Sequence, residues 1–242
     1  MERFRRVPFL VAMGVVAGAI APAGWGCGGG GYVYAGLVGN VPVAGVGARI
    51  TPTPQGFQVL SGHTAGWVGV GGPGQGPNGA DEWIQVGFSA FPDWTGNDLY
   101  YEVARPGSAP TYRRVLAGLP AGEGMRVSVL EMHRRRDWWR VWVDGSPVSA
   151  PIYVPASHGR LRPVMTAESW DGGQDVCNDF LYEFDAIRIA TRSGGTWSPL
   201  GATTTIDDAD TVVLRRAPDV FDAAGGPLAR RALASASAGT DG

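Results

Sequence analysis

The chain is poor in the residues that build metal sites and disulfide frameworks. Among its 242 residues are two cysteines, Cys27 and Cys177, and three histidines. Two cysteines are too few for a structural zinc site, and the histidines lack the spacing of metal ligands. We therefore expect neither a metal nor a cofactor. A disulfide between the two cysteines is possible in an oxidising compartment, and the sequence leaves their pairing open.

Lysine is absent, so all 20 basic residues are arginine, against 22 acidic residues. The formal net charge of −2 gives no basic surface that would attract nucleic acid, and we expect no such partner. The one basic run, Arg134 to Arg136, is interpreted as a solvated hairpin tip rather than as an anion or membrane site.

A long apolar run is found only at the N-terminus. Three arginines within the first six residues precede the apolar stretch 7–20, and small residues follow at 21–23. This is the pattern of a secretory signal peptide. An uncleaved anchor is the competing interpretation, but the run is short for a membrane-spanning helix. We expect removal after Ala23, a secreted or extracytoplasmic protein, and membrane contact only through this segment.

Glycine, proline and tryptophan are frequent, with 38, 18 and 9 residues. Turn-forming residues between aromatic segments are typical of all-β proteins, and 44% hydrophobic residues is too many for a disordered chain. We predict a two-sheet antiparallel β-sandwich or jelly roll over residues 24–223. Residues 224–242 are small and polar and predict a disordered tail. No helix is expected after the signal segment.

Short apolar stretches between turn signals predict the strands of this sandwich. Residues 82–90 show the strongest alternation, with Trp83 and Gln85 on one face and Ile84, Val86 and Phe88 on the other. The predicted strands cover residues 32–35, 43–50, 66–70, 82–90, 99–104, 125–131, 138–143, 148–154, 164–170, 180–190 and 211–215.

Common enzyme motifs are missing: the sequence contains no glycine-rich phosphate loop, no nucleophile elbow and no metal-binding helix motif. What stands out instead are three polar side chains within apolar strand segments, Gln85, Glu102 and Glu168. A buried glutamine or glutamate must find a partner or face a groove. These residues are therefore the candidates for a functional site.

Three segments, Trp67–Val70, Ile84–Phe88 and Asp98–Glu102, resemble successive strands of the glutamic peptidases, or eqolisins (peptidase family G1). Gln85 and Glu168 are 83 residues apart, a spacing similar to that of the glutamine and glutamate in the family's catalytic dyad. The resemblance covers roughly residues 30 to 215.

The resemblance implies a concanavalin-like jelly roll with a concave groove for a polypeptide substrate, and acid endopeptidase chemistry without metal. Glu168 would be the general base that activates water, and the Gln85 amide would stabilise the oxyanion. A carboxyl group with an ordinary pKa of about 4.3 suits such chemistry in acid. The residues expected to shape or support the substrate groove are Trp67, Asp98, Tyr100, Glu102 and Trp170.

The sequence also departs from the family pattern, and this keeps other functions open. Gly71 stands where the family has an acidic residue, although Asp81 or Glu82 in the following loop could replace it. The main alternative is a non-catalytic lectin-like or peptide-binding sandwich that kept the fold without the activity. In that case a glycan could be the ligand. A glycosidase using Glu102 and Glu168 as paired carboxylates is a further, less favoured option.

Overall fold

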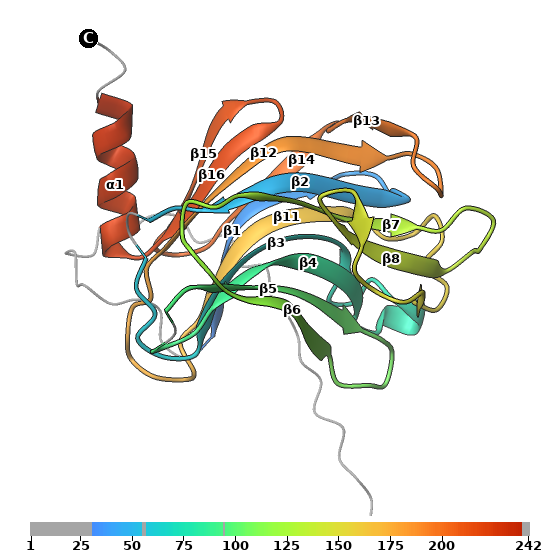
Figure 1. Cartoon of the computed structure of the whole chain (residues 1–242), viewed down its shortest axis with the longest axis horizontal. Helices are drawn as coiled ribbons and strands as arrows, with labels where there is room; N and C mark the ends of the chain where they lie inside the picture. Colours follow the sequence, from blue (N-terminus) through green and yellow to red (C-terminus); the bar gives the residue numbers. More distant parts are fainter. Residues whose placement is uncertain (1–30, 55–56, 94, 239–242) are drawn as a thin grey trace, which may run out of the picture.

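The computed structural model describes residues 31–54, 57–93 and 95–238 (Figure 1). The predicted signal segment and Cys27 lie outside these residues. These residues form two antiparallel sheets packed face to face, with one short 3-10 helix, η1 (Pro77–Gly79), and one α-helix. The all-β two-sheet sandwich predicted from the sequence is confirmed.

The first sheet, sheet A, carries the candidate site. Its seven strands follow the order β14-β1-β11-β3-β4-β5-β6, so neighbours in space come from distant parts of the chain. The bounds of these strands are β1 (Tyr32–Gly39), β3 (His63–Gly72), β4 (Glu82–Ala90), β5 (Asn97–Ala104), β6 (Thr111–Leu119), β11 (Pro163–Trp170) and β14 (Thr203–Asp207).

The second sheet, sheet B, backs sheet A and closes the core. Seven of its nine strands follow the order β10-β8-β7-β2-β12-β16-β15, while β9 pairs with β8 and β13 with β12. The bounds are β2 (Gly45–Pro52), β7 (Met125–Glu131), β8 (Trp138–Val143), β9 (Ser146–Pro147), β10 (Ile152–Tyr153), β12 (Phe180–Ala190), β13 (Trp197–Pro199), β15 (Thr211–Ala217) and β16 (Val220–Gly225).

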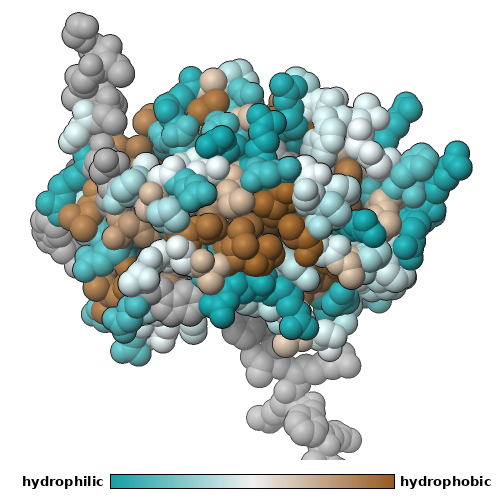
Figure 2. Space-filling view, viewed as in Figure 1, coloured by the Kyte–Doolittle hydropathy of each residue, from teal (hydrophilic) through white to brown (hydrophobic). Residues whose placement is uncertain are grey.

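The hydrophobic core lies between the two sheets. Successive side chains of a strand point to opposite faces, so each strand of sheet A gives alternate residues to the core. Ile84, Val86 and Phe88 of β4 are fully buried there, together with apolar residues of sheet B such as Val46 and Phe184. Figure 2 shows apolar side chains gathered at mid-height, between the levels of the two sheets. The alternation predicted for residues 82–90 is confirmed.

The structure contains strands that the sequence does not predict, and one predicted strand is shorter than expected. Strand β6 was not predicted because it lies at the edge of sheet A and its side chains are largely exposed, which leaves no apolar alternation. The predicted strand at 148–154 is reduced to Ile152–Tyr153. Pro151 cannot donate a backbone hydrogen bond, and proline is confined to the ends or edges of strands.

The chain after β16 forms helix α1 (Pro227–Ala238), where the sequence predicted a disordered tail; this part of the prediction is corrected. Its N-terminus is capped from a distant loop, because the Asp179 Oδ1 accepts hydrogen bonds from the Leu228 N (2.6 Å) and the Ala229 N (3.4 Å). Ala229 and Leu233, one helical turn apart, pack against Leu181. In Figure 1 the helix stands beside β15 and β16.

Cys177 is disulfide-bonded, while Cys27, with which the sequence left its pairing open, lies outside the described residues. Within the described ranges, no helix is both long and apolar enough to cross a membrane.

Candidate functional site

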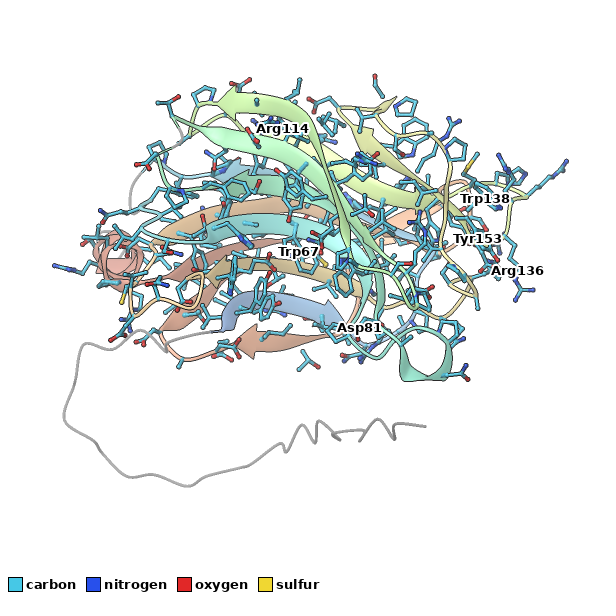
Figure 3. All side chains as sticks on the ribbon, turned by 90° about the horizontal axis from the view of Figure 1, so that it is seen from below. Trp67, Asp81, Arg114, Arg136, Trp138 and Tyr153 are labelled. Carbon is cyan, nitrogen blue, oxygen red and sulfur yellow. The ribbon has the colours of Figure 1, made fainter. Side chains whose placement is uncertain are left out.

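The face of sheet A that points away from the core forms a cavity of about 950 Å³. Figure 3 views this face from below, with Trp67 near its centre. Alternate residues of β1, β3, β4, β5 and β11 line the cavity because they share one side of the pleated sheet. The side chains that matter for its chemistry are His63, Trp67, Gln85, Tyr100, Glu102 and Glu168.

The register of the strands places Gln85 and Glu168 on the same face. Glu168 of β11 lies opposite Ala65 of β3, and Gln85 of β4 lies opposite Gly69 of β3. One strand therefore separates the two residues, and they are offset by four residues along it. Both side chains line the cavity from opposite sides of β3.

Two neighbours hold the carboxylate of Glu168. The indole Nε1 of Trp67 donates a hydrogen bond to the Glu168 Oε2 at 2.9 Å, and the Nε2 of His63 lies 3.6 Å from the Glu168 Oε1. Only 7% of Glu168 is exposed. The position of Trp67 requires a glycine at position 87 on the neighbouring strand, because a Cβ at Gly87 would lie 2.7 Å from the Trp67 Cβ. The carboxylate is thus buried, oriented and directed at the cavity.

A second hydrogen-bonded chain orients Gln85. Its Nε2 donates to the Tyr100 hydroxyl at 3.0 Å. The ring of Tyr100 stacks on that of Tyr112 with 4.9 Å between centroids, and the Tyr112 hydroxyl lies 3.0 Å from the Ser89 Oγ. Burial, followed by the charges of Glu168 and Glu102, raises the pKa of Tyr100 well above its usual value. Tyr100 therefore stays protonated and keeps the amide in place.

Glu102 is a second carboxyl group in the cavity. Its Oε1 accepts a hydrogen bond from the Trp83 Nε1 at 3.0 Å. Burial raises the pKa of Glu102; the Trp83 hydrogen bond works against this shift, and the charge of Glu168 adds to it. Glu102 therefore takes up a proton at a higher pH than an ordinary glutamate, which reduces the negative charge of the cavity in acid.

Aromatic rings surround one end of the cavity. The rings of Tyr32, Phe91 and Trp170 lie around the His63 ring, with centroid distances of 5.7 to 5.8 Å. Trp170 is 38% exposed and does not line the cavity wall itself. The predicted substrate-binding residue Trp170 is therefore at the rim, where it can contact an extended ligand.

The expectation that Asp98 shapes or supports the substrate groove stays a prediction, and the contacts of the residue show where it lies. It is buried and accepts hydrogen bonds from the Arg114 Nη1 (3.1 Å) and the Gly118 N (3.3 Å). It does not line the cavity. Asp98 instead ties β5 to β6 at the edge of the sheet, so its contribution to the site is indirect.

The structure explains the glycine at position 71. Gly71 has a φ of +93°, and a Cβ there would lie 2.2 Å from the Glu82 carbonyl oxygen, so no acidic residue fits. Asp81 does not replace it, because its Oδ1 accepts a hydrogen bond from the Gly74 N within the loop. Glu82 has the same strand parity as Ile84 and is fully buried on the core side of the sheet.

Sequence reasoning missed His63, Trp83 and Tyr112 as members of the site. Two of them could have been found from the sequence. Trp83 lies on the same face of its strand as Gln85, and His63 is four residues before Trp67, on the same side of β3. Tyr112 belongs to β6, a strand that the sequence does not reveal. The described residues include no group of three histidine, cysteine or acidic side chains that could hold a metal ion.

Comparison with solved structures identifies the fold. Scytalido-glutamic peptidase, solved with a peptide-based transition-state analogue, is similar with a TM-score of 0.56 and 16% identity, covering 80% of this chain and 98% of that one. SCP-B, a member of the eqolisin family solved with the tripeptide Ala-Ile-His, is similar with a TM-score of 0.54 and 15% identity over the same shares. In sequence, the chain matches no protein-family model and no curated protein. The structural similarity therefore shows that this chain shares the fold of these two peptidases.

Proposed function

We propose that the protein is a secreted, acid-acting endopeptidase of the glutamic-peptidase type. The observation that carries this proposal is the position of Glu168 and Gln85 on the wall of one cavity, each held by its own hydrogen-bonding partner. The fold shared with peptidases that were solved with peptide ligands supports a polypeptide as the substrate.

In the proposed reaction, the Glu168 carboxylate takes a proton from a water molecule, and the water oxygen attacks the peptide carbonyl carbon. The Gln85 amide uses one N–H for Tyr100 and has a second N–H to donate to the developing oxyanion. When the C–N bond breaks, Glu168 returns its proton to the departing amine nitrogen. Trp67 and Tyr100 hold the two groups in place throughout this cycle.

The second carboxyl group of the cavity supports an acid range for this reaction. The raised pKa of Glu102 means that it takes up its proton at a higher pH than an ordinary glutamate, so its charge repels that of Glu168 less in acid.

The test is digestion of a denatured protein substrate between about pH 2 and 7. We expect cleavage only in acid, and its loss in Glu168→Gln and in Gln85→Ala. Glu123→Gln changes an exposed glutamate that does not line the cavity and serves as the matched control, which should keep full activity. Cleavage that persists in either cavity variant would contradict the dyad.

One observation favours a second function, a peptide-binding sandwich without catalysis. Gly71 stands where the glutamic peptidases have an acidic residue, and neither Asp81 nor Glu82 brings a carboxylate into the cavity in its place. If the folded wild type cleaves nothing at any pH but binds peptides through this cavity, this alternative replaces the enzyme. A glycan screen on the same sample tests the lectin-like form of the alternative.

A further inference from the structure

We propose that His63 is a positioning residue for Glu168: its imidazolium pairs with the Glu168 carboxylate and sets the acid limit of activity. The inference rests on the proposed role of Glu168 as the base. His63 adds a cationic partner to the proposed dyad of Glu168 and Gln85.

The first argument is geometric. His63 begins β3 and lies opposite Trp170 in the register with β11, so its side chain is on the cavity face beside Glu168. The 3.6 Å between the His63 Nε2 and the Glu168 Oε1 is within ion-pair range. The His63 side chain is 19% exposed and that of Glu168 is 9% exposed, so water screens the pair only partly.

The aromatic rings around His63 limit its movement. Tyr32 contacts it from β1, Trp170 from β11 and Phe91 from the end of β4. A ring held on three sides loses few additional rotamers when it forms the ion pair. The usual entropic cost of a surface salt bridge is therefore reduced here.

The second argument concerns charge. The titratable groups that interact with His63 or Glu168 are Glu102 of β5, Tyr32 and Tyr34 of β1, Tyr100 of β5 and Tyr182 of β12. The tyrosines are neutral in acid, since burial raises the pKa of Tyr32 to about 12 and raises the pKa values of the other tyrosines as well. Arg162 also lines the cavity, but within the described ranges Glu168 forms an ion pair only with His63.

The consequence is a specific pH dependence. Histidine is the side chain whose charge changes in the neutral pH range, and its protonated form, the imidazolium, is the form that can pair with a carboxylate in acid. A positive charge within about 4 to 6 Å favours the ionised form of a carboxyl group, which is the form that acts as base. We therefore expect the wild type to remain active at a lower pH than a variant without the charge.

The test is the pH profile of kcat/KM for the wild type, His63→Gln and, as a matched control, His133→Gln at an exposed hairpin. In His63→Gln we expect the acid limb to move up by about half to one pH unit, which is a three- to tenfold loss on that limb. The control profile should coincide with the wild type. An equal loss at every pH, or an unmoved limb, would overturn the proposal.

A second measurement separates this proposal from the proposed function. The NMR signals of the His63 ring are followed through a pH titration in the wild type and in Glu168→Gln, with His133 as the internal reference. Loss of the carboxylate should lower the midpoint of the His63 titration by about half a unit or more and leave His133 unchanged. If the midpoint stays the same, the pair is refuted whether or not the protein cleaves peptides. If it moves but no substrate is cleaved, only the proposed function fails.

Discussion

Within the described residues, the indole N–H of Trp67 is the one hydrogen-bond donor to the Glu168 carboxylate. A hydrogen bond to a charged group contributes about 1.5 to 3 kcal/mol, so its loss should be visible in the rate. We expect Trp67→Phe, which keeps an aromatic ring at this position, to lower kcat about tenfold or more. Trp83→Phe removes the equivalent bond to Glu102 and should have a smaller effect on kcat.

Steady-state kinetics at the pH optimum compare the two tryptophan variants, and circular dichroism checks that both fold. The account is contradicted if Trp67→Phe keeps the wild-type kcat, or if the two variants lose activity equally.

Part of the site could be predicted residue by residue. The alternation along residues 82–90 places Gln85 away from the core, and the spacing to Glu168 agrees with the family resemblance. The roles of Asp98 and Gly71 could not be predicted, because they depend on atoms that come from other strands. Asp98 is held by Arg114 of β6, and Gly71 is constrained by the carbonyl group of Glu82.

At the scale of elements, helix α1 depends on contacts with distant parts of the chain. Its cap, Asp179, is 48 residues before Pro227, and its buried residues Ala229 and Leu233 pack on strands of sheet B. Alanines and serines in the last part of the helix show no strong apolar periodicity. A local pattern therefore predicts a tail, and only the folded sheet reveals the helix.

Leu233→Ala tests this packing. Leu233 is 7% exposed, and the substitution should destabilise the protein by about 2 kcal/mol, the low end for a leucine at the border of a core. Because α1 packs on sheet B, peptidase activity of the folded variant should be unchanged. Urea unfolding gives the free energy, with Leu228→Ala at an exposed helix position as the control. Equal stability of the two variants would show that α1 is not packed as described.

At the scale of the whole molecule, Glu82 couples stability to pH. It is fully buried, neither carboxyl oxygen has a hydrogen-bond partner in the part of the chain that the structure describes, and burial raises its pKa from 4.5 to about 7. The folded state therefore holds a proton that the unfolded state releases, and the contribution of Glu82 to stability is present below pH 4.5. It is lost as the pH rises through 7. Glu82 thus contributes more to stability in acid than above neutral pH, in the direction of the proposed working range.

Glu82→Gln tests this coupling, since a neutral amide has no such titration. The variant should be as stable as the wild type at pH 4 and more stable by about 2 to 3 kcal/mol at pH 8. Urea unfolding of both proteins at several pH values measures the difference. A difference that does not change with pH would contradict the burial of an unpaired carboxyl group.

The sandwich as a whole could be predicted from turn residues, aromatic strands and the lack of helical periodicity. Its strand order could not, because sheet A joins strands that are far apart in sequence: β1 pairs with β11 and β14, which lie more than 120 residues later. This order brings Glu168 into the face that carries Gln85. The cavity is therefore a property of the complete fold rather than of any one segment.

The central claim is that Glu168 is the base of a peptidase. The most direct measurement is the rate of cleavage of a denatured protein near pH 4 by the wild type and by Glu168→Gln, with the melting temperature of both recorded. The account predicts rapid cleavage by the wild type and a loss of at least about a thousandfold in the variant, with similar melting temperatures. Wild-type cleavage that survives in Glu168→Gln, or a folded wild type that cleaves nothing, would contradict it.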